Sequence, residues 1–255
     1  MRASSPHITL NLNTLTDAER SQLVALLFPV HQRIFDGSTS QSFKQQVLQC
    51  NADYSYLRVR LNRLGEAIGY CTVHFFHIDQ GERPASIMRS QAGLLPEYRR
   101  GNSVTPFILR TILGYRLRHP RRRLSFFATL IHPSSYLLCD KYARQFWPRP
   151  SSTLPAESWR LLRHCLLRFG YQASHEATPQ VVSVGLRTLD RDSDRAFWQR
   201  SDKPAVRFFL RNNPGYADGH GLVTLMPLTL SNLFTVATRL LHDRIQRRLR
   251  GKQRS

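Results

Sequence analysis

The chain has 255 residues, of which 41% are hydrophobic and 10% aromatic, a composition that fits a globular protein and excludes a disordered chain. Its length fits either one large domain or a domain of ordinary size with a long extension. The formal net charge is +20, carried almost entirely by arginine, which predicts an anionic partner: a phosphorylated cofactor, nucleic acid, an acidic carrier protein or an anionic membrane. The alternative is that the charge only keeps the protein in solution.

The cysteines and the first residues exclude two further classes of protein. Cys50, Cys71, Cys139 and Cys165 are far apart, with no Cys-x-x-Cys pair and no His at zinc-finger spacing, so we expect neither a disulfide framework nor a structural zinc site. Residues 1–15 alternate polar and apolar side chains instead of forming one apolar block, which is not typical of a signal peptide. We therefore expect the protein in the cytoplasm.

The first half of the chain alternates strand and helix patterns. Thr16, followed by Asp17 and Glu19, predicts a helix start, and the Asn and Gly of residues 62–66 predict a hairpin turn. In chain order we expect a strand at 8–12, a helix to about 35, a break at 37–40, a weaker helix at 42–50, strands at 54–60, 67–76 and 85–94, and a helix at about 103–118.

The second half begins with an apolar run typical of a buried strand. In order we expect a strand at 124–131, a helix at 136–146, a boundary at 147–152, a helix at 156–169, a strand at 181–186, a charged helix at 192–211, a turn at 213–216, an apolar run at 222–230 and a helix at 231–249. Together these elements predict an α/β (α+β) fold in two parts, residues 1–150 and 151–255.

The segment from 85 to 118 carries the sharpest chemical signal. A strand that enters a helix through a tight loop points main-chain N–H groups at one spot, and the helix dipole favours an anion there. Gly101 lets the backbone approach that anion closely, while Arg99 and Arg100 add positive charge. The alternative is a capped helix with a solvated basic edge.

The element order, with the sequence Leu-Pro-Glu-Tyr-Arg-Arg-Gly-Asn-Ser at 95–103, resembles the GNAT acyltransferase superfamily over about residues 8–146. The resemblance implies a largely antiparallel sheet flanked by helices, with an acyltransferase core at 1–150 and an extension at 151–255. Tyr98 stands where the family has Gln or Arg, and Ser103 replaces a small apolar residue. The resemblance further implies that coenzyme A phosphates contact Arg99, Arg100, Gly101, Asn102 and Ser103, and that the pantetheine arm follows the backbone of Gln91, Ala92 and Gly93.

A second landmark of the family is a tyrosine that protonates the departing thiolate, on the helix after the buried strand. Cys139 stands at that position, and Tyr142 and Tyr136 on the same helix are the alternative acids. Cys139 is equally compatible with a buried structural cysteine. We expect His132 to cap this helix.

Other ionisable residues form no competing site. Glu66 and Glu97 are candidate bases by residue type only, and we favour surface carboxylates. His74 and His77 face opposite sides of a strand, which disfavours a shared metal ion. We therefore expect no metal site.

The C-terminal helix combines an apolar face with many arginines. Residues 222–237 contain no charge, but Pro227, Asn232 and several hydroxyl side chains make a transmembrane span an unfavourable interpretation. The helix either lies on an anionic membrane or packs on the acyltransferase core, and we favour packing. Its predicted apolar face comprises Leu233, Phe234, Ala237, Leu240, Leu241, Ile245 and Leu249.

The resemblance leads to one main hypothesis and one rival. The main hypothesis is an acyltransferase that moves an acyl group from acyl-CoA, or from an acyl carrier protein, to an amine acceptor. The layout of core and extension is similar to that of N-acyl amino acid synthases. The rival is a catalytically silent GNAT-like module whose arginines engage nucleic acid or an anionic membrane. Membrane contact would place the protein at the inner membrane face.

Overall fold

A computed structural model describes residues 6–78, 84–99, 104–150, 152–171 and 180–252. Contacts group the chain into two compact units, residues 1–124 with 185–191 and residues 125–184 with 192–255. Each unit combines antiparallel strands with helices, which confirms the predicted α/β (α+β) class. The predicted acyltransferase core at 1–150 and extension at 151–255 are a functional division and stay a prediction.

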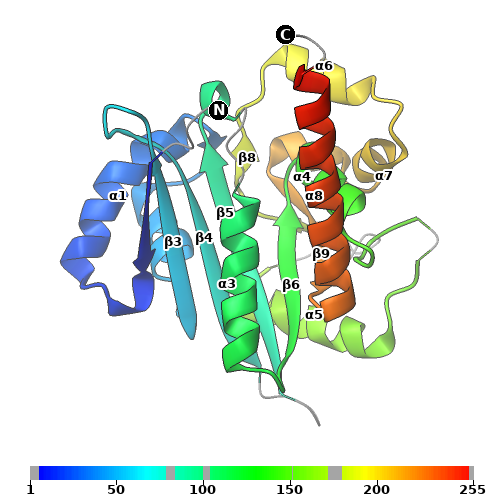
Figure 1. Cartoon of the computed structure of the whole chain (residues 1–255), viewed down its shortest axis with the longest axis horizontal. Helices are drawn as coiled ribbons and strands as arrows, with labels where there is room; N and C mark the ends of the chain where they lie inside the picture. Colours follow the sequence, from blue (N-terminus) through cyan, green and yellow to red (C-terminus); the bar gives the residue numbers. More distant parts are fainter. Residues whose placement is uncertain (1–5, 79–83, 100–103, 151, 172–179, 253–255) are drawn as a thin grey trace. The chain divides into compact units, whose positions relative to one another are not determined.

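The first unit is built on an antiparallel sheet in the order β1-β3-β4-β5 (Figure 1). The expected hairpin between the second and third of these strands is confirmed. There the Asn62 side chain accepts hydrogen bonds from the backbone of Leu64 and Glu66, and Gly65 takes a φ of +82°. The strands are β1 (His7–Asn11), β3 (Tyr54–Leu61), β4 (Ala67–Ile78) and β5 (Ala85–Leu94).

Helices cover both faces of this sheet. The first, α1 (Asp17–Gln32), starts with a capping box in which Thr16 and Glu19 satisfy each other's backbone N–H groups, as the sequence predicts. Along β3 successive side chains alternate, so Leu57 faces a core that α1 and α2 (Ser40–Phe43) cover, while Arg58 faces α3 (Thr105–Arg118).

Aromatic packing fixes α3 on its face of the sheet. The Tyr115 ring stacks on Phe75 with 4.0 Å between ring centroids, and its hydroxyl donates to Ser86 Oγ at 2.7 Å. These contacts bury Tyr115 near the end of α3, and Phe107 and Ile112 are buried earlier in the same helix.

A second, two-stranded sheet joins distant parts of the first unit. In it β2 (Phe35–Asp36) pairs with β8 (Arg187–Thr188). The predicted strand at 181–186 is too long, because β7 (Val181–Ser183) ends before Gly185, whose φ is +69°. A Cβ on Gly37 would lie 1.9 Å from the Gly185 carbonyl oxygen, so this approach requires glycine.

The second unit contains the antiparallel order β6-β9-β7 and most of the helices. Within it α4 packs against both α7 and α8. Its elements are β6 (Arg123–Leu130, in this unit from Ser125), α4 (Pro133–Tyr142), α5 (Ala156–Arg168), α6 (Asp192–Gln199), α7 (Pro204–Asn212), β9 (His220–Pro227) and α8 (Leu230–Lys252).

Three predicted helices differ from the structure. The helix predicted at 192–211 is two helices, because Pro204 lacks an N–H and starts α7 instead of continuing α6. The helix predicted at 136–146 is α4, which ends at Tyr142 because Ala143 is extended. The helix predicted at 42–50 begins at Ser40 and continues from α2 as a π-helical turn, Lys44–Leu48. Short 3-10 turns lie at Leu12–Thr14, Pro96–Tyr98 and Pro214–Asp218.

The apolar face expected on α8 is only partly buried. Leu233 and Leu240 are half-buried, whereas Phe234 is 72% exposed and Leu241 is 59% exposed. The expected packing of this face on the acyltransferase core stays a prediction. Within the described residues, no helix combines the length and apolar character needed to cross a bilayer.

Candidate functional site

The predicted donor-binding segment follows β5 in the first unit. The Leu95 N–H donates to the Ile68 carbonyl at 3.0 Å, and the Pro96–Tyr98 turn then leads the chain out of the sheet. Arg99 is exposed, and its Nε donates to the Leu94 carbonyl at 3.2 Å. The predicted phosphate contacts of Arg100, Gly101, Asn102 and Ser103 lie outside the described residues and stay a prediction.

The N-cap residue of α3 is apolar. Val104 is the N-cap residue and makes no side-chain cap hydrogen bond, and the first turn contains no acidic residue. Pro106 has no N–H to satisfy. The Phe107 and Ile108 N–H groups donate to the Val104 carbonyl at 3.1 and 3.2 Å, so it is the positive end of the helix dipole that favours an anion at this end of α3.

The three residues expected to follow the pantetheine arm lie together near the end of β5. In the ladder with β4, Gln91 is opposite Thr72 and Gly93 is opposite Tyr70, with Ala92 between them. Ala92 is exposed, whereas Gly93 is buried. A Cβ on Gly93 would come within 3.1–3.2 Å of side-chain atoms of Ile34, Phe35 and Tyr70. Close packing of the end of α1 on the strand is thus one reason for glycine at this position.

Tyr136, one of the three candidate acids, is a core residue of the second unit. It is 0% exposed, its ring packs against Phe146 and Phe209, and its hydroxyl donates to the Pro148 carbonyl at 2.8 Å. Burial raises the pKa of the Tyr136 hydroxyl, and the nearby Asp140 adds to this shift. These contacts give Tyr136 a structural role in holding the chain after α4.

Cys139 is half-buried on the same helix, and its thiol is not activated. Burial raises the pKa of Cys139 to about 12, and the neighbouring Asp140 carboxylate acts in the same direction. A thiolate leaving group ordinarily has a pKa of about 8.5, so this thiol is a poor proton donor to it.

Tyr142 is the half-buried candidate with a titratable partner. Its hydroxyl donates to Asp243 Oδ2 at 2.6 Å, and Lys141 pairs with the same carboxylate. Burial, and then the hydrogen bond to Asp243, raise the pKa of Tyr142, so the phenol keeps its proton at neutral pH. Asp243 lies far along the chain on α8, and no sequence signal connects it with Tyr142.

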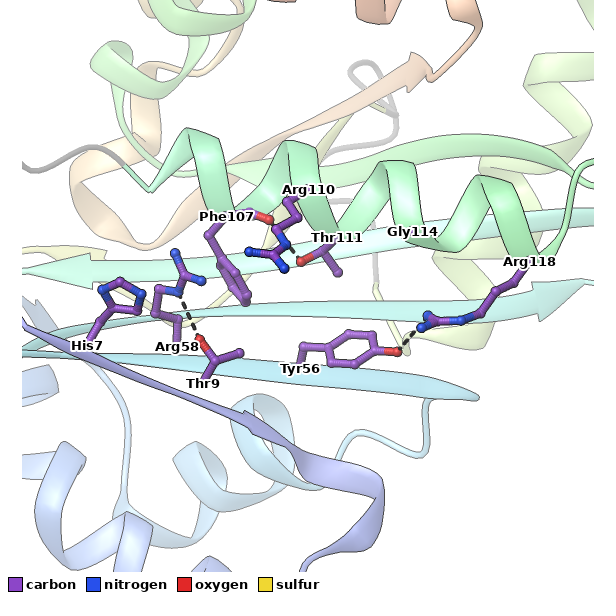
Figure 2. A pocket seen from close by; sticks show the side chains of 9 residues that line it. All are labelled: His7, Thr9, Tyr56, Arg58, Phe107, Arg110, Thr111, Gly114 and Arg118. Atoms are coloured by element: carbon purple, nitrogen blue, oxygen red, sulfur yellow. Dashed lines mark hydrogen bonds between the residues drawn. The ribbon is translucent and has the colours of Figure 1, made fainter.

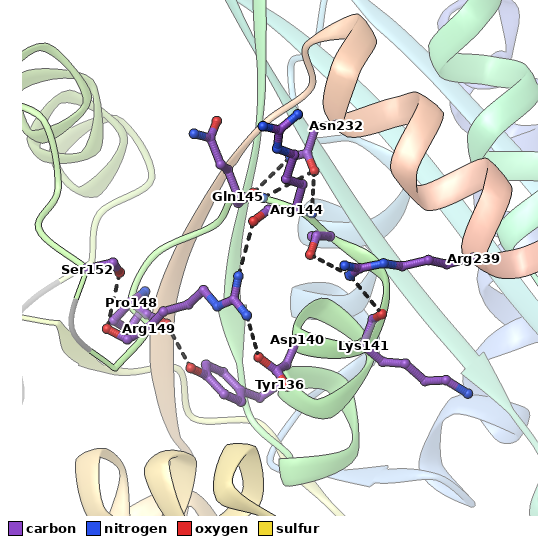
Figure 3. Close-up of polar contacts among 11 residues, drawn as sticks. Tyr136, Asp140, Lys141, Arg144, Gln145, Pro148, Arg149, Ser152, Asn232 and Arg239 are labelled. Carbon is purple, nitrogen blue, oxygen red and sulfur yellow. Dashed lines mark hydrogen bonds and ion pairs between the residues drawn. The ribbon is translucent and has the colours of Figure 1, made fainter.

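A polar clamp holds the C-terminal end of α4 against α8 (Figure 3). Asn232 accepts hydrogen bonds from the backbone N–H groups of Arg144 and Gln145 at 2.7 and 3.3 Å, and its amide donates to the carbonyls of Gln145 and Pro227 at 2.8 Å each. Arg239 donates to two further carbonyls at this end of α4. The clamp fixes the helix that carries all three candidate acids.

The remaining sequence-predicted side chains have structural partners. His132 caps α4 through a hydrogen bond from the Ser134 N–H to its Nδ1 at 3.2 Å, which confirms the expected role. Glu97 pairs with Arg33 at the surface, and Glu66 accepts from Asn62 in the hairpin turn. Among the described residues, no group of three His, Cys, Asp or Glu side chains is placed to hold a metal ion.

The sequence matches no family model and no curated protein. Solved structures similar to the chain include Arabidopsis thaliana NAA60 in complex with acetyl-CoA, at 15% identity and a TM-score of 0.37, covering 55% of this chain and 89% of that chain. Another is aminoglycoside 6'-N-acetyltransferase AAC(6')-IG from Acinetobacter haemolyticus, at 13% identity and a TM-score of 0.38, covering 58% and 97%. A third is a GNAT family acetyltransferase from Staphylococcus aureus, at 14% identity and a TM-score of 0.27, covering 46% and 82%. At these TM-scores the likeness carries no argument about the activity of this chain.

Proposed function

We propose that the protein is an N-acyltransferase that moves an acyl group from acyl-CoA to an amine. The observation that supports this most is the passage from β5 into α3, where a glycine-containing basic sequence precedes a helix with an apolar N-cap residue and no acidic residue in its first turn. The helix dipole favours a diphosphate there, and main-chain N–H groups of the preceding loop would donate to it. The resemblance of residues 95–103 to the GNAT loop assigns that diphosphate to coenzyme A.

The donor would be held at two places in the first unit. Its diphosphate would lie at the loop of Arg99, Arg100 and Gly101, and its pantetheine arm would run along the β5 backbone near Gln91. An acyl carrier protein presents the same phosphopantetheine arm and is acidic, so it would also suit a chain with a net charge of +20.

The transfer itself needs few catalytic groups. The neutral amine attacks the thioester carbonyl, a C–N bond forms as the C–S bond breaks, the nitrogen loses a proton and the departing thiolate gains one. Holding the two reactants together supplies much of the acceleration. We assign protonation of the thiolate to Tyr142, because Tyr136 is 0% exposed and the pKa of Cys139 is raised to about 12, whereas Tyr142 is only half-buried. Its hydroxyl, which donates to Asp243, would have to turn to the thiolate.

Ligand-induced thermal stabilisation tests this proposal. Acetyl-CoA, a long-chain acyl-CoA and free CoA should each raise the Tm of the full chain, because binding at 100 times Kd adds about 2.7 kcal/mol to the free energy of unfolding. Gly101→Glu places a carboxylate at the diphosphate position and should abolish the shift. Leu64→Glu adds the same charge at a hairpin position that is 83% exposed, and should keep it.

The outcomes are clearly separated. If neither CoA nor either thioester stabilises the wild type, the proposed function is wrong. Stabilisation that survives in Gly101→Glu would move the donor site away from α3. An acyl carrier protein that binds where acyl-CoA does not would retain the reaction and change the donor.

A further inference from the structure

A basic pocket in the first unit lies apart from the proposed donor loop. It has a volume of about 450 Å³ and is lined by residues of β1, β3 and the side of α3 (Figure 2). Four of the lining side chains are His7, Arg58, Arg110 and Arg118, and none of the lining residues that the structure describes is Asp or Glu. The volume is in the range of small-molecule sites, which is about 300–1,000 Å³.

Arg58 is held in place by two contacts that leave part of its guanidinium unused. Its Cζ lies 4.4 Å from the centre of the Phe107 ring, and its Nε donates to Thr9 Oγ1 at 3.1 Å. Within the described part of the chain, its terminal nitrogens donate no hydrogen bond. Burial, and then the like charge of Arg60, lower the pKa of Arg58, so the charged form gains from any anion that approaches.

Two further arginines mark the ends of the pocket along α3. Arg110 is exposed, lies almost one turn beyond Phe107, and its like charge adds to the lowering of the pKa of Arg58. Arg118 stands eight residues further along the helix, about 12 Å at the helical rise. Its Nη1 is 3.4 Å from the Tyr56 hydroxyl, a weak hydrogen bond.

The middle of the pocket is lined by a residue without a side chain. Gly114 lines it, and a Cβ built there would meet no atom within 4 Å. Thr111 lies beside Gly114, and its hydroxyl donates to the Phe107 carbonyl. A ligand bound at one end of the pocket therefore has room to extend toward the other.

Positive charges that share a half-enclosed pocket repel one another, and a bound anion relieves that repulsion. Guanidinium groups match phosphate oxygens in bidentate geometry. We propose that this pocket binds a phosphorylated small molecule of nucleotide size, with a phosphate between Arg58 and Arg110 and its remainder along Gly114 toward Arg118. This site would lie along the side of α3, whereas the proposed donor diphosphate lies before its first turn.

Calorimetric titration of the full chain at 150 mM salt tests the proposal, with sodium pyrophosphate, ATP and citrate as probes. The Gly101→Glu background removes the proposed donor site, so that binding reports on the pocket alone. Pyrophosphate and ATP should bind, and Arg110→Gln should weaken both at least tenfold. Arg121→Gln removes the same charge from an exposed residue that does not line the pocket, and should leave binding unchanged.

Gly114→Leu separates shape from charge, because it fills the middle of the pocket and removes no arginine. This substitution should raise the Kd for ATP at least tenfold and leave the Kd for pyrophosphate within threefold of its value without the substitution. Binding of vesicles with phosphoinositide headgroups, lost in Arg110→Gln, would support the same chemistry with a lipid as its source.

Three outcomes would overturn the proposal. One is the absence of binding heat for pyrophosphate and ATP. Another is equal weakening by Arg110→Gln and Arg121→Gln, which would show attraction by net charge alone. The third is citrate binding as tightly as the phosphates. Loss of CoA binding in Gly101→Glu with pyrophosphate binding intact would separate this site from the proposed donor site.

Discussion

Mild acid should destabilise the first unit, because two of its histidines are buried in the neutral form. His31 is 3% exposed, with its Nδ1 2.7 Å from the Tyr70 hydroxyl and its Nε2 2.8 Å from Ser38 Oγ. His74 is 2% exposed, with its Nδ1 2.6 Å from Ser55 Oγ. Burial lowers the pKa of His31 to about 4, and burial followed by the charge of Arg89 lowers the pKa of His74 to about 3.

The sign and size of the effect follow from linkage. Each folded-state pKa lies below the unfolded value of about 6.5, so the unfolded chain binds more protons below that pH. This stability is fully present above pH 6.5 and is lost as the pH falls toward the folded pKa. When the pH falls from 7.5 to 5.0, each of the two histidines should lower the free energy of unfolding by at most about 2 kcal/mol. Carboxylates with lowered pKa, such as Asp36, act at lower pH.

Urea unfolding followed by far-UV circular dichroism at pH 7.5, 6.5 and 5.0 measures this effect. His31→Phe keeps an aromatic ring among Phe28, Phe35 and Phe43 and should remove about half of the pH dependence. His242→Phe, at an exposed position on α8, should leave the pH dependence unchanged. Equal stability at pH 7.5 and 5.0, or the same pH dependence in His31→Phe as in the wild type, would show that burial of neutral His31 does not destabilise the fold in acid.

Three substitutions test other parts of the account. Gly93→Ala should cost about 1–3 kcal/mol in unfolding free energy, because its methyl group overpacks against Tyr70 and its neighbours; unchanged urea midpoints would contradict this. Asn232→Ala removes four hydrogen bonds, three to Arg144 and Gln145 just after α4 and one to the Pro227 carbonyl, and should cost about 2–4 kcal/mol in the same assay; a loss under 0.5 kcal/mol would be inconsistent with the clamp. Tyr142→Phe should lower kcat of acyl transfer at least tenfold, with KM for the thioester and Tm little changed. Wild-type kcat in that variant would remove Tyr142 from the mechanism.

Local chemistry made much of the fold predictable. The capping box of Thr16 and Glu19, and the turn between Asn62 and Gly65, depend on residues that are close in sequence. Alternation along β3 likewise separates the Leu57 face from the Arg58 face. Elements that rest on such short-range signals appear where the sequence places them.

The differences between the predicted and the observed elements have two kinds of cause. Pro204 is a local signal, because a proline lacks the N–H that a helix interior needs, and it marks the start of α7 after α6 has ended. The pairing of β2 with β8 is instead a contact between segments far apart in sequence, fixed by the close approach of Gly37 to Gly185. Such pairing leaves no periodic trace in the sequence.

The candidate sites also differ in whether their residues are close together in sequence. The loop before α3 could be found from its own residues, although residues 100–103 lie outside the described part of the chain. Partners from other elements could not be found, because Tyr142 and Asp243 are 101 positions apart and the basic pocket joins β1, β3 and α3. Each predicted role at these positions therefore depends on contacts that folding creates.

Hydrogen–deuterium exchange of the full chain, with and without saturating CoA, would locate the donor. Exchange should slow for backbone amides at residues 91–93 and in the loop and first turn that lead into α3, with little change in α5. Binding of CoA with protection confined to other segments, or with none between residues 91 and 108, would contradict the proposed donor site.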